Sequence, residues 1–114
     1  MSTPSAILDR LRLGTGLSEQ DRPRVVAALG SLPQHLVRWD PDDIALEVRV
    51  KERDGDEQSV TLEARLPGWP PLIATAQDRD LERALREARH ELIRQIEDRK
   101  DLEHPAKGGG RRPA

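Results

Sequence analysis

Residues 44 to 66 contain the pattern that most restricts what this chain can fold into: two runs of alternating apolar and polar side chains. The apolar positions are Ile44, Leu46, Val48 and Val50 in the first run, and Val60, Leu62, Ala64 and Leu66 in the second. Such alternation is typical of antiparallel strands with one face in a core and the other in water. Between the runs lies Asp54-Gly55, a strong hairpin-turn signal. The sequence therefore predicts a β-hairpin over 44–66.

Two further elements follow the hairpin. A Pro-rich loop over 67–71 leads to a short third strand at 72–76, and then to an amphipathic helix over about 79–102. The apolar stripe of this helix consists of Leu81, Leu85, Ala88, Leu92 and Ile96. Spacings of three and four residues place such side chains on one helix face. Asp78 is the predicted N-cap, because a carboxylate there accepts hydrogen bonds from free backbone N–H groups.

The N-terminal third gives a weaker pattern. Asp21 followed by Pro23 marks a helix start, and Gly30 and Pro33 interrupt the pattern that follows. We therefore predict a broken or two-part helix over about 22–38. Residues 5–14 fit either a short helix or a short strand, and the local pattern leaves both open.

The predicted elements, in order, are helix, strand, strand, strand and helix, with a weak or absent strand in front. This order predicts an α+β two-layer sandwich in which two helices pack on one face of an antiparallel sheet. We expect one domain over 1–103. Residues 104–114 contain Lys107-Gly-Gly-Gly-Arg-Arg-Pro and are predicted to form a flexible basic tail.

Composition restricts the core and the chemistry. The 114 residues include no Cys, Phe or Tyr, so the core must be aliphatic and disulfides, thiol nucleophiles and cysteine-based zinc sites are excluded. In such a chain Trp39 and Trp69 are expected to cap the small core. A Trp69 ring exposed in its loop, stacking on a base or meeting a partner, is the other possibility.

The sequence shows no feature of a secreted or membrane-spanning chain. No apolar run approaches the roughly 20 residues that a spanning helix needs, so we expect a cytoplasmic protein that does not contact membranes. Basic residues number 19 and acidic residues 21. This balance argues against a generic polyanion-binding protein, because such domains are usually strongly basic.

We find no catalytic constellation. His35, His90 and His104 have no metal-ligand spacing among themselves or with carboxylates, and no phosphate-binding loop or nucleophile motif is present. The sequence therefore predicts a protein that is not an enzyme and has no catalytic residue, no metal, no cofactor and no small-molecule substrate.

The long helix carries a charge pattern opposite its apolar stripe. At 100° per residue, a basic ridge forms from Arg79, Arg83, Arg86, His90 and Arg94. An acidic strip of Asp80, Glu87, Glu91 and Asp98 runs beside it. The ridge could be a solvated surface with ion pairs such as Glu82–Arg86 and Arg83–Glu87. It could also follow an RNA phosphate backbone.

A resemblance to a known family favours the second interpretation. The segment Leu72-Ile-Ala-Thr-Ala-Gln-Asp-Arg-Asp-Leu-Glu-Arg-Ala-Leu, which leads into the basic helix, resembles the ribosome hibernation-promoting factors, also called ribosome-associated translation inhibitors. The strand over 44–51 resembles the second strand of this family. The resemblance covers roughly residues 20–102.

The resemblance implies a β-α-β-β-β-α fold and binding to rRNA of the small ribosomal subunit near the decoding region, which inhibits translation or promotes hibernation. In this chain Arg79, Arg83, Arg86, His90 and Arg94 would contact RNA, assisted by Arg22 and Arg24. We expect a divergent short form of the family, monomeric away from the ribosome. It departs from the family in its weak first strand, in its broken first helix with few basic residues and in the acidic strip.

The alternative is a protein-interaction module of the same fold that binds a protein partner through the sheet edge or the Trp69 loop.

Overall fold

The computed structural model describes residues 4–53 and 55–103, so the predicted tail at 104–114 and Asp54 lie outside the described residues. The helices and strands, in chain order, are α1 (Pro4–Asp9), β1 (Arg12–Leu13), α2 (Arg22–Ala28), β2 (Ala45–Lys51), β3 (Gln58–Arg65), β4 (Leu72–Asp78) and α3 (Leu81–Glu103). Three short 3-10 turns accompany them: η1 (Glu19–Asp21), η2 (Pro33–His35) and η3 (Pro41–Asp43). The α+β class predicted from the sequence is confirmed.

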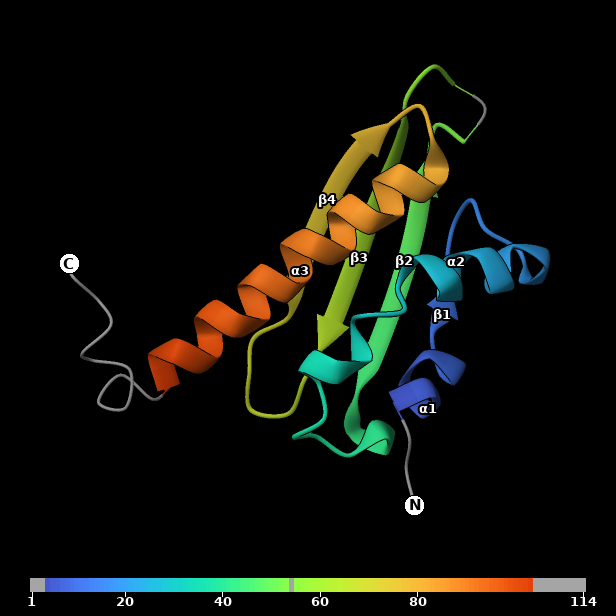
Figure 1. The fold of residues 1–114 in the computed structure, drawn as a ribbon. Helices are drawn as coiled ribbons and strands as arrows, with labels where there is room; N and C mark the ends of the chain where they lie inside the picture. The colour runs from blue at the N-terminus through green and yellow to red at the C-terminus, as the bar shows by residue number, and fades with distance from the viewer. Residues whose placement is uncertain (1–3, 54, 104–114) are drawn as a thin grey trace.

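The four strands form one sheet in the order β1-β2-β3-β4 (Figure 1). The predicted hairpin is present, with β2 and β3 antiparallel and Val48 opposite Leu62. All eight alternating apolar side chains of the hairpin are buried. The third strand is also present and pairs antiparallel with β3. The period-two pattern thus predicted both the strands and the face that they bury.

The sheet differs from the prediction at its first strand. β1 exists but spans two residues, and it pairs parallel to β2, with Arg12 opposite Glu47. The sheet is therefore mixed and not purely antiparallel. The reason is the connection: α2 lies between β1 and β2, and a crossover through a helix returns the chain in the same direction. At the start of this crossover Gly16 has φ +83°, and a Cβ there would lie 2.2 Å from the Val50 carbonyl oxygen. Only glycine fits this close approach.

The N-terminal third contains both elements that the sequence left open. Residues 4–9 form a helix, and the chain then enters β1. The predicted break after residue 22 is confirmed: α2 ends at Ala28, and a separate 3-10 turn forms at Pro33–His35. Gly30 and Pro33 explain the break, because proline lacks the N–H that a continued helix requires.

The helix α3 begins two residues later than predicted, and its N-cap differs from the prediction. The Asp80 carboxylate accepts a hydrogen bond from the Glu82 N–H at 2.9 Å, whereas Asp78 accepts one from the Asp80 N–H at 2.8 Å. Asp80 is therefore the N-cap, and Asp78 closes the turn before it. Because the chain leaves β4 only at residue 78, two residues are needed to redirect it before helical geometry begins.

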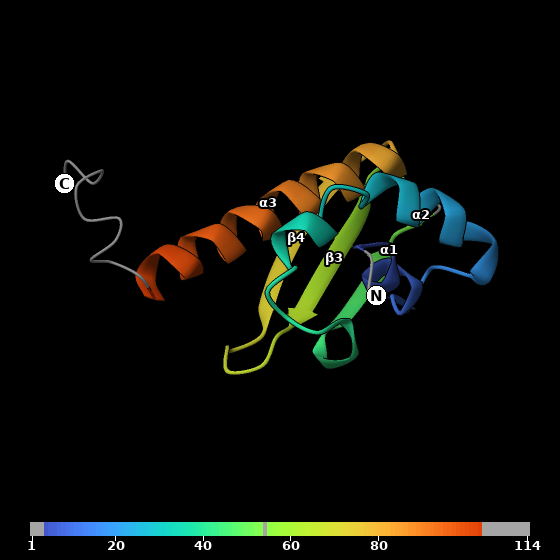
Figure 2. The same ribbon diagram turned by 60° about the horizontal axis from the view of Figure 1, so that its bottom comes forward.

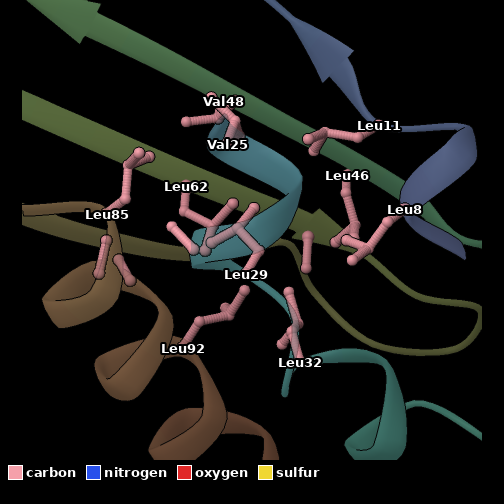
Figure 3. Packing of buried hydrophobic residues seen from close by; sticks show 14 of the residues in the cluster. Leu8, Leu11, Val25, Leu29, Leu32, Leu46, Val48, Leu62, Leu85 and Leu92 are labelled. Carbon is pink, nitrogen blue, oxygen red and sulfur yellow. The ribbon is translucent and has the colours of Figure 1, made fainter. Parts of the chain in front are cut away.

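The helices α2 and α3 cover one face of the sheet (Figure 2). The apolar stripe predicted for α3 is buried throughout its length. In the core, Leu62 of the sheet, Leu85 and Leu92 of α3, and Leu29 after α2 gather between the layers (Figure 3). Burying each such side chain contributes roughly 1.5–3 kcal/mol. This aliphatic core fixes α3 across the sheet with its opposite side in solvent.

Both tryptophans cap the core, as predicted. Trp69 is 9% exposed, and its ring meets that of Trp39 edge to face with centroids 4.9 Å apart. The Arg38 guanidinium lies over both rings, and the Trp69 indole N–H donates to the Glu103 carboxylate. This cluster ties the loop over 67–71 to the last turn of α3, and it leaves no exposed Trp69 ring for a partner.

Candidate nucleic-acid interface

The solvent side of α3 carries the basic side chains that the sequence singled out. Arg79, Arg83, Arg86, His90 and Arg94 are all exposed. Arg79 precedes the helix, and the others lie on it because the apolar stripe holds the opposite side against the sheet. The ridge is thus present as a surface. What each guanidinium contacts decides which of them can bind a phosphate.

Three arginines of this surface are unpaired. Within residues 4–53 and 55–103, the side chains of Arg79, Arg83 and Arg86 make neither a hydrogen bond nor an ion pair, and the same is true of the His90 ring. The ion pairs Glu82–Arg86 and Arg83–Glu87, which the spacing allowed, do not form. We call these four residues the α3 ridge. Their charges are available to an external anion.

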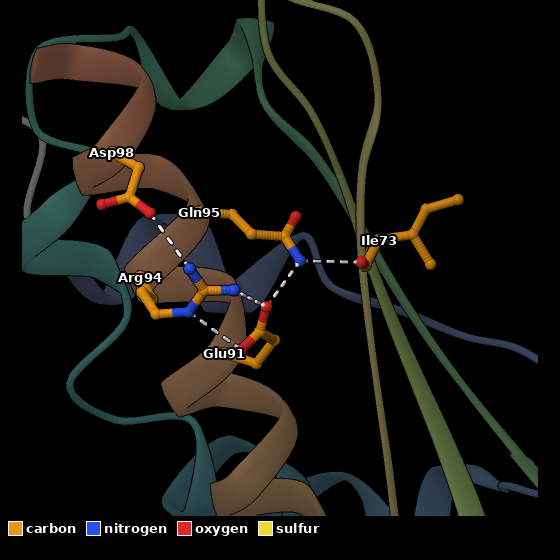
Figure 4. A network of polar contacts seen from close by, with 5 residues as sticks. All are labelled: Ile73, Glu91, Arg94, Gln95 and Asp98. Atoms are coloured by element: carbon orange, nitrogen blue, oxygen red, sulfur yellow. Dashed lines mark hydrogen bonds and ion pairs between the residues drawn. The ribbon is translucent and has the colours of Figure 1, made fainter. Parts of the chain in front are cut away.

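The Arg94 side chain, in contrast, is paired. Its guanidinium donates to the Glu91 carboxylate and, at 3.1 Å, to that of Asp98 (Figure 4). Glu91 is also held by Gln95, whose amide donates to the Ile73 carbonyl of β4 at 3.0 Å. The hydrogen bond from Arg94 lowers the pKa of Glu91. The helix periodicity places Arg94 with the ridge, but its charge is already balanced by two carboxylates.

The two arginines of α2 also differ from each other. Arg22 donates to the Glu19 carboxylate at 2.7 and 2.9 Å and to the Leu11 carbonyl at 2.9 Å. It therefore holds the start of α2 against the end of the N-terminal segment. Arg24 is exposed, and its side chain has no hydrogen bond or ion pair among the described residues. Only Arg24 of this pair is available to a ligand.

The structure brings Arg24 close to Arg79. Both line a depression at the start of α3, together with Arg53 of the hairpin turn. Asp80 and Glu82 also line this depression, so its charge is mixed. The basic surface therefore extends from the α3 ridge to Arg24, with carboxylates beside its first turn.

Arg53 has a role that no sequence pattern indicated. It donates to both carboxylate oxygens of Asp21, at 3.1 and 3.2 Å, and to the Gly16 carbonyl at 2.8 Å. The hydrogen bond from Arg53 lowers the pKa of Asp21 to about 2. These partners lie 32 and 37 residues away. No local spacing could have indicated them.

The described histidines do not form a metal site, and His35 has a structural contact. His35 contacts the Glu97 carboxylate through Nδ1 at 2.9 Å, and Lys100 donates to both Glu97 and the His35 carbonyl. Among the described residues, no group of three or more histidine or carboxylate side chains could hold a metal ion. His104 lies outside them. In the same part of the chain, no helix is both long and apolar enough to cross a membrane.

Comparison with solved structures finds this fold in other proteins. The structure of a ribosomal subunit interface protein from Coxiella burnetii matches with a TM-score of 0.53 and 19% identity, over 79% of this chain and 96% of the other. The N-terminal domain of Protein Y from Thermus thermophilus matches with a TM-score of 0.54 and 20% identity, over 75% and 91%. Both belong to the hibernation-promoting factor family.

The chain shares their fold. The family resemblance seen in the sequence is thereby confirmed for the architecture. No protein-family model matches the sequence, and no curated protein matches it significantly in a sequence search. At about one identical residue in five, the likeness that these comparisons show lies in the arrangement of the elements.

Proposed function

We propose that this protein is a noncatalytic ribosome-associated factor that binds small-subunit rRNA near the decoding region and inhibits translation or promotes hibernation. The α3 ridge and Arg24 contact RNA phosphates in this proposal. Arg22 and Arg94, included in the prediction from sequence, take structural roles.

One observation carries the proposal: exposed arginines with unpaired side chains lie before α3 and along it, on a fold shared with a protein named for the ribosomal subunit interface. Arginine presents a planar fork of N–H donors that matches phosphate geometry. An unpaired guanidinium retains this capacity in full, because binding RNA requires no internal ion pair to break. The arrangement therefore suits a phosphate backbone running along the helix.

Ribosome co-sedimentation at two salt concentrations tests the proposal. The variant Arg83→Gln/Arg86→Gln removes two charges from the α3 ridge. The matched control is Arg12→Gln/Lys51→Gln, which removes two charges from exposed side chains outside α3. We expect wild type and control to pellet at low salt and to be released as salt rises. For the ridge variant we expect weaker binding and a salt slope reduced by about 1.4 to 1.8, because each of the two lost phosphate contacts removes about 0.7–0.9.

A wild-type protein that stays in the supernatant at low salt would refute the proposal. The alternative of a protein partner at the sheet edge would then take its place. Equal losses in the ridge variant and the control would show that charge in general, and not this surface, governs binding.

The location on the ribosome needs its own measurement. Chemical footprinting of both rRNAs, with and without the protein, is expected to show protection in the decoding region of the small subunit. An in vitro translation assay with the same variants is expected to show inhibition by wild type and less by the ridge variant. Protection confined to the large subunit would contradict the proposed position.

A further inference from the structure

A second depression lies beside the α3 ridge, between α3 and the segment that follows α2. Its lining consists of Ser31, His35, Arg89, His90, Ile93 and Arg94. Its volume of about 370 Å³ falls in the range of small-molecule sites, roughly 300–1,000 Å³. It shares His90 with the ridge, so RNA that follows the ridge passes its rim.

The chemistry of this depression differs from that at the start of α3. No carboxylate lines it, whereas Asp80 and Glu82 line the other. Ile93 supplies an apolar surface, half-buried against the core. His35 and His90 supply planar rings, and the contact of Nδ1 with Glu97 fixes the ring of His35. Planar rings beside an aliphatic side chain form a surface on which a flat, polar molecule can stack.

Arg89 supplies hydrogen-bond donors that the protein itself does not use. One Nη donates to the Ala28 carbonyl at 2.9 Å, which positions the guanidinium at the end of α2. Its Nε is buried and has no partner. The enclosed Nε is not open to the depression, so the donors that Arg89 can offer to a ligand are the terminal Nη N–H groups that do not bond Ala28. Arg89 thus leaves donor capacity unused beside a depression whose lining lacks acceptor carboxylates.

We propose that this depression accepts an unstacked nucleobase of the RNA whose backbone follows the α3 ridge. The base would lie against Ile93 and the His90 ring, and its ring or carbonyl acceptors would receive hydrogen bonds from Arg89. The inference rests on the proposed function and adds a preference for RNA with an unpaired base. A continuous duplex would meet the ridge without filling the depression.

Fluorescence anisotropy with two kinds of labelled RNA tests the inference. One is a single strand of roughly eight nucleotides, prepared with each of the four bases in turn, and the other is its abasic counterpart of the same charge. We expect at least one base-bearing RNA to bind about fivefold or more tightly than the abasic RNA, since base stacking on a side chain is worth at least that factor.

Three variants separate the base site from the ridge. His90→Ala removes a ring from the depression, and Ser31→Leu adds bulk to its lining; both should remove the preference for the base-bearing RNA. Arg83→Gln/Arg86→Gln should weaken binding of both RNAs and keep their ratio. Because the two RNAs carry equal charge, a change of charge at residue 90 affects them alike. Circular dichroism melts verify that each variant is folded.

The outcomes distinguish this inference from the proposed function. Equal affinity of wild type for base-bearing and abasic RNA, with ribosome pelleting intact, overturns the base site alone. A preference that survives in both His90→Ala and Ser31→Leu overturns it as well. Failure of wild type both to pellet with ribosomes and to bind any of the RNAs at low salt overturns the proposed function together with the base site.

Discussion

Asp21 shows how a single residue can join distant parts of the chain. Its carboxylate lies between Arg53 and the Ser18 N–H, which donates to it at 2.9 Å. The side chain of Asp21 is only 17% exposed. The ion pair is therefore partly shielded from solvent, and it connects the start of α2 to the hairpin turn.

We expect Asp21 to make stability depend on pH in the acid range. Its pKa in the folded protein is about 2, below the ordinary value of 3.8. The carboxylate therefore stabilises the fold above pH 3.8, and this contribution is lost as the pH falls toward 2. At pH 7, Asp21→Asn should lower the free energy of unfolding by on the order of 1–2 kcal/mol.

Urea denaturation of wild type and Asp21→Asn at several pH values measures this effect. The difference between the two proteins should shrink as the pH falls. Asp42→Asn is the control: Asp42 pairs with Arg10 on the surface, and exposed pairs contribute less than about 1 kcal/mol. A constant difference between wild type and Asp21→Asn down to pH 2 would contradict the prediction.

Substitutions of Trp69 can separate a role in stability from a role in binding a partner. Trp69→Ala should lower the free energy of unfolding by about 3–5 kcal/mol, because it leaves a large cavity in the core. Trp69→Phe keeps an aromatic ring but loses the indole N–H and its hydrogen bond to Glu103, at a cost of about 1–2 kcal/mol. Ribosome pelleting by Trp69→Phe should equal that of wild type. Loss of pelleting with little change in stability would instead favour a partner contact through this loop.

At the scale of elements, the first turn of α3 is the clearest case. Asp80→Ala should destabilise the protein by about 1 kcal/mol, since it removes the N-cap. Asp78→Ala should cost less, because Asp78 bonds a backbone N–H outside the helix. Thermal melts of the two variants measure the difference. A larger loss for Asp78→Ala would place the helix start earlier than residue 81.

The α3 helix also contains exposed arginines that are unpaired, such as Arg86, and one that is paired, Arg94. We expect Arg86→Gln to reduce the salt slope of ribosome binding by about 1. Arg94→Gln should change it little, because Glu91 and Asp98 already balance the Arg94 charge. Pelleting across a salt series measures both slopes. If the two variants lose affinity equally, internal pairing does not decide which arginines bind RNA.

At the scale of the molecule, charge is distributed unevenly between the two faces. On the sheet face opposite α3, Arg49 bridges Glu47 and Glu63, and Arg65 pairs with Glu63. Hydrogen bonding, first from Arg65 and then from Arg49, lowers the pKa of Glu63. The helix face holds the unpaired arginines of the α3 ridge. The chain therefore has a basic surface although its net charge is −2. The balanced numbers of acidic and basic residues do not exclude RNA binding.

The stability of the whole molecule depends on the one aliphatic core between sheet and helices. Leu62 lies in the centre of this core and is 0% exposed, whereas Ile73 of β4 is 51% exposed. Leu62→Ala should lower the free energy of unfolding by about 2–5 kcal/mol. Ile73→Ala, the matched control, should cost less than about 1 kcal/mol. Urea denaturation measures the free energy of unfolding of both variants. Similar losses in the two would mean that the open sheet face is covered in solution.

Local patterns in the sequence determined most of the elements. Period-two alternation predicted the hairpin and its buried face, and spacings of three and four predicted the buried stripe of α3. The reason is that strand and helix geometry repeat over a few residues, so neighbouring side chains carry the information. The break in the first helix could also be predicted, because Gly30 and Pro33 act on their own backbone.

Tertiary structure decided which charges remain free. The spacing allowed Glu82–Arg86, Arg83–Glu87 and the pairs of Arg94 equally, yet only Arg94 is paired. In the fold, Gln95 bonds the edge of β4 and contacts Glu91, which holds this carboxylate beside Arg94. The sequence alone thus determined where the arginines lie along the chain. Packing determined which of them remain unpaired, because an ion pair forms where the fold brings its partners together and holds them there.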